Sequence, residues 1–394
     1  MKFREYNIYN ENFYFLKYYM YQRILQENIE KWFFSGKIIT VYGPRQVGKT
    51  TLIQKILEKY SDTHFILSLN ADEERVRNAF IPSSFEELKN TIGNPDILFI
   101  DEAQRIKNIG LVLKIIHDNL PDLQIIITGS STLSLANTIS EPLTGRNIEF
   151  QLFPLSLQEV SNNAFEASGN ISQMMLWGSY PDVFQSNIDQ KKILLQNLTN
   201  QYLYQDILEY GNIKKPHLLK KLLQLLAFQI GSEVSLSELS STLEIDKKTV
   251  EKYLDLLEKS FVIFPITAFS RNLRREISRS KKYFFYDLGV RNMLIENFLD
   301  IDIRNDKGGL FENLYILERL KYKRYNNDFG SLYFWRTHTN KEIDLIEEKN
   351  GKIFATEIKF SNKKNPDCPN DFVNAYPNSS YKIVNPENFW NSLV

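Results

Sequence analysis

The sequence predicts an α/β protein with a parallel sheet in its N-terminal part. Two observations lead to this prediction. Residues 37–153 alternate short β-rich runs with amphipathic stretches, a pattern that indicates a parallel sheet with helices on both faces. The composition, with 43% hydrophobic and 24% charged residues, is that of a globular protein. At 394 residues, the chain is long enough for more than one domain.

The first expected domain covers residues 1–153. It begins with a lead-in that contains a helix-like stretch at 16–34, which should pack on the sheet. The strands of the sheet are expected at 38–42, 65–69, 97–100, 124–128 and 148–152. The helices between them are expected at 51–60, 85–91 and 110–119.

The rest of the chain divides into three expected regions. Residues 154–214 are mainly helical in pattern and predict a helical lid or linker, interrupted by a turn at 178–181. Residues 215–300 show three helical patterns, at 218–229, 237–243 and 247–260, and then β-rich runs at 261–267 and 282–287. This is the order of a winged helix-turn-helix. Residues 301–394 predict a helix at 310–323 and strands at 332–337, 342–347 and 352–360.

Charge and cysteine content bear on where the protein is located and which partners it has. The formal net charge is zero, so a surface for nucleic acid has to be local. Cys368 is the only cysteine in the chain, and the sequence does not open with a secretory signal. No apolar run approaches the length of about 20 residues that a membrane helix needs. We therefore expect a cytoplasmic protein with no membrane partner.

The strongest motif is a phosphate-binding loop that lies between the first expected strand and the helix after it. Its glycines let successive backbone N–H groups face the phosphates of a nucleotide, its lysine reaches the β and γ oxygens, and its threonine hydroxyl binds Mg²⁺. The alternative, an accidental Gly-Lys-Thr turn, does not explain the flanking strand and helix. The expected ATP-binding residues are Gly43, Pro44, Arg45, Gln46, Val47, Gly48, Lys49, Thr50 and Thr51.

Two carboxylates follow the strand at 97–100 and suit a Walker B element. Asp101 is expected to hold Mg²⁺ together with Thr50, and Glu102 to orient and activate the attacking water. A solvated turn is the alternative for an isolated Asp-Glu pair. The position after the phosphate loop favours the catalytic interpretation, with Lys49, Asp101 and Glu102 as catalytic residues for ATP hydrolysis.

Two polar residues further along the chain are weaker candidates. Ser130 follows the strand at 124–128, where its hydroxyl is expected to sense the γ-phosphate; the alternative is a helix N-cap. Arg146 precedes the strand at 148–152 and is expected to act as an arginine finger on a neighbouring subunit. A solvated arginine at a strand start is the alternative. The finger interpretation requires a homo-oligomer.

Several motifs together resemble a family of bacterial and archaeal AAA ATPases with a C-terminal DUF4143 domain. The resemblance implies an AAA-like P-loop ATPase module, a helical lid, a winged helix and a C-terminal α/β domain similar to restriction endonucleases. Family members often have Gly-Gly-Tyr-Pro where this chain has Gly-Ser-Tyr-Pro. The motifs are Gly-Pro-Arg-Gln-Val-Gly-Lys-Thr-Thr at 43–51, Asp-Glu-Ala-Gln at 101–104, Thr-Gly-Ser-Ser at 128–131, Leu-Thr-Gly-Arg at 143–146, Pro-Leu-Ser-Leu-Gln-Glu at 154–159, Gly-Ser-Tyr-Pro-Asp at 178–182 and Tyr-Leu-Tyr-Gln-Asp-Ile at 202–207.

A nuclease of the restriction type needs a helix carboxylate, an Asp at a strand end and a Glu-x-Lys on the next strand. Glu312, Asp344, Glu357 and Lys359 occur in this order and are the catalytic candidates, with Asp344 and Glu357 as the expected metal ligands. Alternation along a strand places Glu357 and Lys359 on one face. Such domains can also keep the fold and lose the cleavage.

Basic residues in two places favour contact with DNA. Lys247, Lys248 and Lys252 lie at the start of the third helix of the expected winged helix, and residues 271–282 form the most basic stretch of the chain. A protein-docking surface is the alternative. Two functions remain open: an ATPase coupled to DNA binding and metal-dependent cleavage, or an ATP-gated switch that binds proteins and carries an inactive nuclease-like domain. ATP and Mg²⁺ are the expected cofactors of both.

Overall fold

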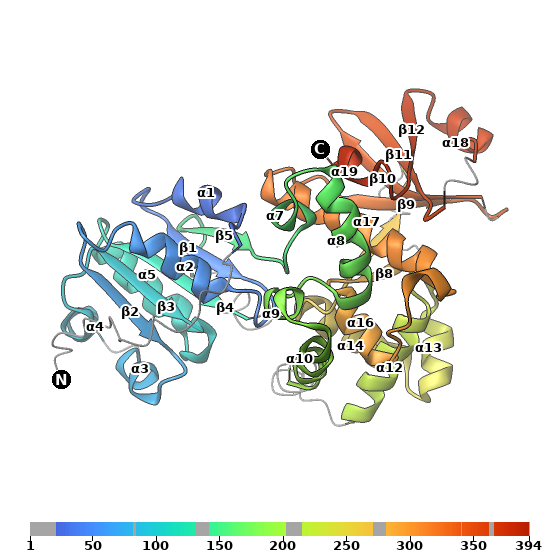
Figure 1. Ribbon diagram of the computed structural model, residues 1–394. Coiled ribbons are helices and arrows are strands. Elements are labelled where there is room, and N and C mark those ends of the chain that lie inside the picture. Colours follow the sequence, from blue (N-terminus) through green and yellow to red (C-terminus); the bar gives the residue numbers. More distant parts are fainter. Residues whose placement is uncertain are drawn as a thin grey trace. The chain divides into compact units, whose positions relative to one another are not determined.

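The computed structural model describes residues 21–81, 84–130, 142–201, 215–270, 281–339, 341–361 and 366–393. The chain forms two compact units, Met1–Phe153 and Pro154–Val394. Each unit contains its own sheet (Figure 1). Within the described ranges, no helix combines the length and the apolar character needed to cross a membrane.

The first unit is built on a five-stranded sheet with the order β2-β3-β4-β1-β5. All four pairings between neighbouring strands are parallel, which confirms the predicted α/β fold with a parallel sheet. Because parallel strands end at the same edge, the loops after β1, β3 and β4 come together there. The strands are β1 (Ile38–Tyr42), β2 (Ile66–Asn70), β3 (Ile97–Asp101), β4 (Gln124–Gly129) and β5 (Asn147–Gln151).

The helices of the first unit lie close to their expected positions, with two differences. The helix expected at 16–34 is only Leu25–Glu30 in the described part, because turns follow it and Phe34 takes a left-handed conformation. The helix Glu74–Ala79 has no predicted counterpart because it is short and buries only Val76. The helices are α1 (Leu25–Glu30), α2 (Lys49–Glu58), α3 (Glu74–Ala79), α4 (Phe85–Ile92), the short 3₁₀ helix η2 (Ala103–Arg105) and α5 (Ile109–Asn119).

The core of the first unit covers both faces of the sheet. Leu98 and Ile125 share a hydrophobic cluster with residues of α4 and α5. Phe99 and Ile126 are next to them in the sequence, and their side chains point to the opposite face. Both are almost completely buried as well. The near-continuous apolar strands are therefore those of a sheet that is covered on its two sides.

The second unit contains a seven-stranded mixed sheet with the order β12-β11-β10-β9-β7-β8-β6. The ribbon strands β7 and β8 pair antiparallel, and β7 also pairs in parallel with β9 over Thr267 and Ala268. The β10–β11 hairpin turns at Asn350 and Gly351, both with positive φ, as a tight two-residue hairpin requires. The strands are β6 (Glu233–Val234), β7 (Ile263–Ala268), β8 (Lys281–Phe285), β9 (Leu332–Arg336), β10 (Glu342–Lys349), β11 (Lys352–Ile358) and β12 (Ser379–Val384).

Helices make up most of the remaining second unit. Three of them, α12, α13 and α14, precede the β7–β8 ribbon in the order that the sequence predicts. Asp287 lies outside the strand expected at 282–287 and instead caps α16, where it accepts a hydrogen bond from the Val290 N–H. The helices are α7 (Leu157–Val160), α8 (Ala164–Trp177), α9 (Pro181–Gln185), α10 (Ile188–Gln201), α12 (Pro216–Phe228), α13 (Leu236–Leu243), α14 (Lys247–Lys259), α16 (Leu288–Leu294), η4 (Ile301–Ile303), α17 (Lys307–Tyr325), α18 (Asn370–Ala375) and α19 (Phe389–Leu393).

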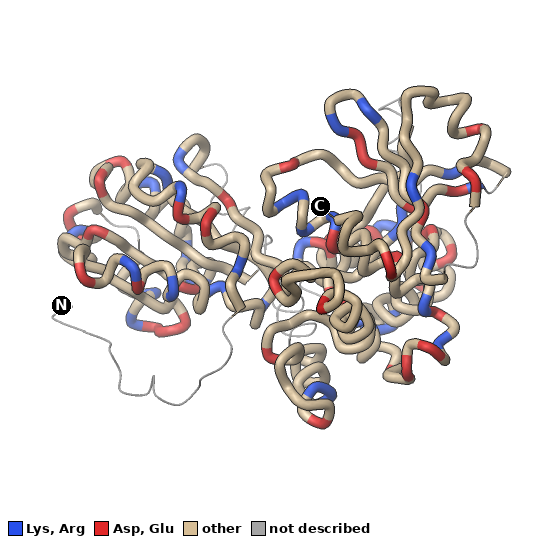
Figure 2. Tube along the Cα trace, turned by 45° about the horizontal axis from the view of Figure 1, so that its top comes forward, with Lys and Arg blue, Asp and Glu red and all other residues tan. Residues whose placement is uncertain are grey.

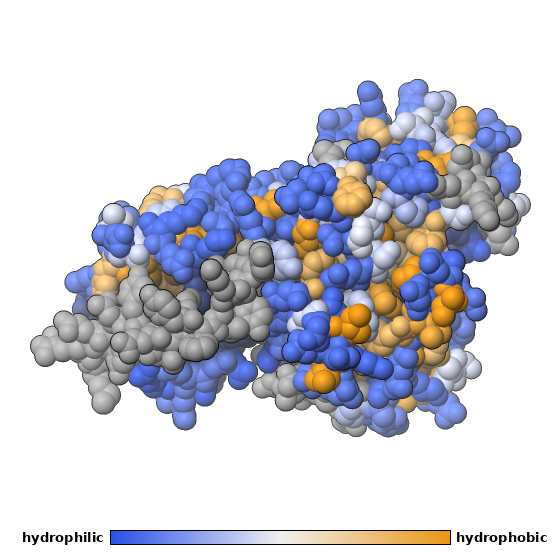
Figure 3. Space-filling model, viewed as in Figure 1, coloured by the Kyte–Doolittle hydropathy of each residue, from blue (hydrophilic) through white to orange (hydrophobic). Residues whose placement is uncertain are grey.

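The expected regions 154–214, 215–300 and 301–394 all lie within the second unit. A single sheet joins the ribbon strands of the second region to the strands of the third, because β7 contacts β9. Positive and negative residues are interspersed along both units (Figure 2). Hydrophilic residues cover much of the visible surface of each unit, with apolar residues between them (Figure 3). The division into three regions remains a prediction.

Candidate functional site

The phosphate-binding loop of the first unit lies between β1 and α2, at the edge of the sheet where the parallel strands end. Gly43 has φ +153°, and a Cβ at this position would lie 2.1 Å from the Leu152 carbonyl oxygen. Gly48, at φ +91°, starts α2 from a left-handed conformation. Both positions need glycine because a side chain would meet backbone or strain it. The loop therefore has the open backbone that a phosphate group requires.

Lys49 and Thr50 occupy the first turn of α2. The Lys49 side chain is buried, and its ammonium group donates hydrogen bonds to the carbonyl oxygens of Gly43 and Pro44, at 2.9 and 2.8 Å. The Thr50 hydroxyl donates to Asp101 Oδ2 at 2.9 Å. This last hydrogen bond joins the loop to the end of β3, so the two halves of the predicted nucleotide site meet in the structure.

The residues of this site fit Mg²⁺ and a nucleotide. A hydroxyl and a carboxylate side by side, Thr50 and Asp101, are the oxygen ligands that Mg²⁺ takes in such sites. The loop glycines leave the space that a Cβ would fill. We therefore expect Thr50 and Asp101 to hold the metal and residues 43–51 to hold the phosphates.

Asp101 and Glu102 are held by β4, which lies next to β3 in the sheet. The Thr128 hydroxyl donates to Asp101 Oδ1, and the Glu102 N–H donates to the Thr128 hydroxyl at 3.3 Å. Glu102 itself has φ +51°, a conformation that non-glycine residues adopt at a cost of about 1 kcal/mol or more and that is concentrated at functional sites. Thr128 thus holds the Asp101 carboxylate and the Glu102 backbone, a role that the sequence reasoning missed.

Ser130 is buried at the end of β4 and accepts a hydrogen bond from Gln104 Nε2 at 3.1 Å. The same nitrogen contacts Glu102 Oε2. Gln104 therefore bridges the catalytic carboxylate and the predicted sensor, and it is a second residue that sequence reasoning did not select. Its position in the Asp-Glu-Ala-Gln motif was the available signal. The N-cap alternative for Ser130 depends on residues 131–141, which lie outside the described part of the chain.

Arg23 also supports the phosphate loop, although no motif marks it. Its guanidinium group is buried and donates to the carbonyl oxygens of Val47 at 2.7 Å and Phe153 at 2.6 Å. Val47 belongs to the loop, and Phe153 lies just after β5. Arg23 thereby fastens the loop to the end of the neighbouring strand.

Arg146 lies away from the phosphate loop. It directly precedes β5, whose first residue pairs with the first residue of β1, so it is at the edge of the sheet opposite to the loop. Its guanidinium group binds the Asp118 carboxylate through two hydrogen bonds of 2.6 and 3.0 Å. Five residues of extended strand span about 15 Å, so Arg146 does not reach the nucleotide site of its own chain. Its role as a finger for a neighbouring subunit stays a prediction.

The C-terminal candidates lie together in the second unit. Glu312 is on α17, Asp344 on β10, Glu357 on β11 and Lys359 directly after β11, one residue beyond the strand end. Lys359 Nζ lies 2.5 Å from Glu357 Oε1 and 3.5 Å from Asp344 Oδ2. Asp344 Oδ2 also accepts a hydrogen bond from the Ile358 N–H at 2.8 Å.

A residue that sequence reasoning did not select joins this group. Lys282, on β8, lies 3.2 Å from Glu312 Oε1 and also contacts Glu342 Oε1. Burial alone would lower the pKa of Lys282, but the carboxylates of Glu312 and Glu342 raise it above the usual value. Burial raises the pKa of Glu312, and Lys282 opposes that rise. The ammonium group of Lys282 is therefore held in its charged form.

The carboxylates of the second unit do not fit a metal ion in their present arrangement. A lysine ammonium group lies against Glu312 and Glu342, and another lies against Asp344 and Glu357. Over the ranges that the structure describes, no three His, Cys, Asp or Glu side chains form a group that could hold a metal. The metal-ligand roles of Asp344 and Glu357 remain predictions.

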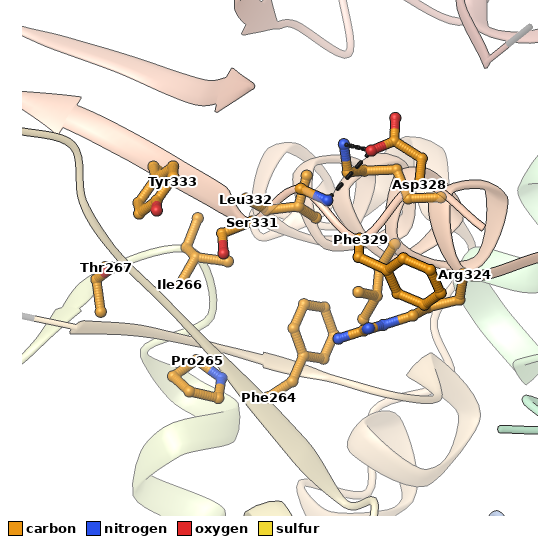
Figure 4. Close-up of a pocket in the computed structure, with 13 residues that line it drawn as sticks. Phe264, Pro265, Ile266, Thr267, Arg324, Asp328, Phe329, Ser331, Leu332 and Tyr333 are labelled. Carbon is orange, nitrogen blue, oxygen red and sulfur yellow. Dashed lines mark hydrogen bonds and ion pairs between the residues drawn. The ribbon is translucent and has the colours of Figure 1, made fainter. Parts of the chain in front are cut away.

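The second unit also contains a pocket of about 380 Å³ where β7 and β9 diverge (Figure 4). Phe264, Phe329 and Tyr333 contribute aromatic side chains to its lining, and Arg324 contributes a guanidinium group (Figure 4). None of the predicted site residues lines this pocket. We assign it no part in the nucleotide site.

The fold and the loop geometry together define the first unit as a P-loop domain. Residues 35–161 match the family model of an AAA domain. Residues 168–301 match a domain of unknown function (DUF8612), and residues 307–389 match a second domain of unknown function (DUF4143). The AAA and DUF4143 matches agree with the resemblance that the motifs indicated.

Proteins similar to this chain occur in bacteria and archaea. An uncharacterized protein of Mycobacterium tuberculosis is 27% identical over 326 residues, which cover 82% of this chain and 70% of that protein. An uncharacterized protein of Methanocaldococcus jannaschii is 26% identical over 382 residues, 89% of this chain and 84% of that protein.

Among solved structures, Cdc6p from Pyrobaculum aerophilum aligns with 12% identity and a TM-score of 0.28, over 69% of this chain and 93% of that one. AMPPCP-bound DnaA from Aquifex aeolicus aligns with 17% identity and a TM-score of 0.26, over 59% and 84%. Similarity at this level adds nothing to the assignment of the fold.

Proposed function

We propose that the protein is a Mg²⁺-dependent ATPase whose first unit hydrolyses ATP. The observation that carries this proposal is the hydrogen bond between Thr50 and Asp101, which joins the phosphate loop to the carboxylates of β3. Mg²⁺, when bound, neutralises charge on the phosphate oxygens. Lys49 exchanges its contacts with the loop carbonyl oxygens for the β and γ oxygens. Glu102 orients a water molecule and accepts its proton as the water attacks the γ-phosphorus and ADP leaves.

Substitutions at these positions test the ATPase proposal. Lys49→Ala should lower ATP turnover, measured as released phosphate, to background because the phosphates lose their cationic partner. Glu102→Gln should retain bound ATP but stop its hydrolysis, since an amide accepts no proton from water. Lys59→Ala is the matched control: its lysine lies on the surface just after α2 and pairs with Glu30. Normal turnover in Lys49→Ala would overturn the proposal.

We further propose that the ATPase is coupled to DNA binding through α12, α13, α14 and the β7–β8 ribbon, acting as a winged helix. The order of these elements and the exposed lysines at the start of α14, Lys247, Lys248 and Lys252, support this proposal. Most of the basic stretch 271–282 lies outside the described residues. Asp246 and Glu251 reduce the positive charge of this surface.

The DNA proposal predicts a measurable salt dependence. Replacing the three lysines of α14 with alanine should weaken binding to duplex DNA in fluorescence anisotropy. If each lysine contacts one phosphate, the slope of log Kd against log salt should fall by about 3. A control variant with three exposed lysines of the first unit replaced, Lys31, Lys59 and Lys107, should bind DNA as the wild type does. Equal salt slopes for the two triple variants would contradict the proposal.

The alternative function is an ATP-gated switch whose C-terminal domain does not cleave DNA. Lys282, which lies against Glu312, favours an inactive C-terminal site over metal-dependent cleavage by Glu312, Asp344, Glu357 and Lys359. Incubation of plasmid and single-stranded DNA with Mg²⁺ or Mn²⁺ separates the two functions. Cleavage by the wild type that Lys359→Ala abolishes would establish the nuclease, and stable DNA would support the switch.

A further inference from the structure

Lys282 is one of several charged side chains of the second unit that are almost completely buried, and it is the one that contacts the candidate Glu312. Its side chain is 2% exposed, and its ammonium group contacts two carboxylates from different elements, Glu312 on α17 and Glu342 on β10. The ammonium group also lies over the Phe334 ring, with Nζ 5.4 Å from the ring centre. A charge this deeply buried is maintained only where it is paired.

The surroundings of Glu312 are equally closed. Its side chain is 13% exposed. A Cβ added to Gly231 would come within 2.7 Å of Glu312 Oε2, so the backbone after α12 packs directly on this carboxylate. The Glu312 carboxylate is thus covered by backbone on one side and bound by Lys282 on another.

The same arrangement recurs a short distance along the sheet, where Lys359 lies between Asp344 and Glu357. Two ammonium groups therefore each contact two of the four carboxylates, and Arg336 Nη1 also lies 3.7 Å from Glu342 Oε2. Asp344 also acts electrostatically on Lys282, so the two groups form one charged network. In a carboxylate site for a divalent ion, the oxygens converge on the ion at about 2.0 to 2.6 Å. In this structure the carboxylate oxygens instead surround the ammonium nitrogens of Lys282 and Lys359.

We propose that Lys282 is the resident cation of the C-terminal carboxylate site, where its ammonium group takes the position that a divalent ion would need between Glu312 and Glu342. The lysine is supplied by the β7–β8 ribbon, whereas the carboxylates come from α17 and β10. The ribbon therefore closes the space between Glu312 and Glu342 to metal ions. Removal of the ammonium group leaves the largely covered Glu312 carboxylate and the partly exposed Glu342 carboxylate with space for a cation between them.

Replacement of Lys282 by methionine tests this inference, because methionine keeps the length of the side chain and loses its charge. Wild type and Lys282→Met are titrated with Mn²⁺ alone, without nucleotide or DNA, by isothermal calorimetry and thermal unfolding. We expect Lys282→Met to bind Mn²⁺ at least about tenfold more tightly than the wild type. At about a hundredfold excess over Kd, its Tm should rise by about 5 °C.

A double variant separates metal binding from a general loss of structure. Lys282→Met combined with Glu312→Gln removes the ammonium group together with one of its two carboxylate partners, so the extra Mn²⁺ affinity should disappear. Because the nucleotide site is the same in all variants, ATP turnover reports whether the first unit is intact. Circular dichroism reports whether the whole chain is folded.

The results of the Mn²⁺ titrations are independent of the tests of ATP hydrolysis and DNA binding. Tight Mn²⁺ binding by the wild type that is lost in Glu312→Gln would overturn the proposal, and so would a folded Lys282→Met variant with wild-type Mn²⁺ affinity. If Lys282→Met unfolds, the double variant still tests the ion pair: recovery of its fold supports the pairing, and failure to recover refutes it. ATP or DNA results do not enter this comparison.

Discussion

Replacing Arg23 with alanine should loosen the phosphate loop, although Arg23 lies outside every nucleotide-binding motif. Its guanidinium group donates to Val47 of the loop at 2.7 Å and to Phe153 at 2.6 Å. The side chain is buried, so water does not readily replace these contacts. In the alanine variant, the loop loses its connection to the end of β5 while Lys49, Thr50 and Asp101 stay unchanged.

The size of the effect follows from the two hydrogen bonds. Each one joins a charged donor to a carbonyl oxygen and contributes about 1.5 kcal/mol or more, so the free energy of unfolding should fall by about 3 kcal/mol. If half of this energy or more orders the loop, the Kd for ATP should rise about tenfold to a hundredfold. For Arg23→Lys, the free energy of unfolding and the Kd for ATP should lie between those of the wild type and those of Arg23→Ala. One ammonium group does not reproduce the planar pair of donors of the guanidinium group.

The assay combines urea unfolding with equilibrium binding of ATP in the presence of Mg²⁺. Arg75→Ala is the matched control, since the guanidinium group of Arg75 pairs with Glu73 on the surface, where both side chains are about half exposed. It should unfold and bind ATP as the wild type does. If Arg23→Ala also bound ATP with wild-type affinity and unfolded at the same urea concentration, the loop would not depend on this clamp.

Three further predictions concern other parts of the chain. Gly43→Ala should abolish ATP binding, because its Cβ would lie 2.1 Å from a backbone oxygen; retained binding by calorimetry would show that the loop adapts. Burial raises the pKa of Asp287 to about 6, above its unfolded value, so the wild type should gain about 2 kcal/mol of stability as pH falls from about 7 to about 4. Asp287→Asn should lack this gain in urea unfolding, and parallel pH profiles would refute the assignment. Arg146→Ala should lose ATP turnover and regain it when mixed with Glu102→Gln subunits. Asp118→Ala, which frees Arg146 from its ion pair, should keep its ATP turnover. Failed complementation would leave Arg146 with a structural role.

The pattern of the sequence predicted the first unit almost completely. Its three central strands, β1, β3 and β4, are apolar runs that are almost wholly buried, and such runs are visible in the sequence because nearly every position is apolar. The edge strands β2 and β5 carry polar residues and are partly exposed. The phosphate loop was equally visible, because its backbone needs glycine at fixed positions and its chemistry needs Lys49 and Thr50. Local sequence determines both features.

Short and polar elements were harder to predict. The helix α3 buries little apolar surface, and β6 has only two residues. Neither element therefore shows a periodic repeat of apolar residues in the sequence. The strand β11 ends at Ile358, two residues before the expected end, although the Lys359 N–H still donates to the Val384 carbonyl oxygen of β12. Tertiary contacts decided these boundaries.

The sequence alone determined an α/β protein with a nucleotide site at residues 43–51, 101 and 102, because those residues are close in sequence or follow the ends of recognisable strands. Only the tertiary structure showed that Arg23 fastens the loop, that Gln104 joins Glu102 to Ser130, and that Lys282 enters the C-terminal carboxylate site. These contacts join residues whose side chains meet only when the chain is folded, and charge pairing between distant residues leaves no local pattern. The physical reason is that neighbouring residues largely determine backbone conformation and the pattern of burial. The partner of a buried charge depends instead on how whole helices and strands pack together.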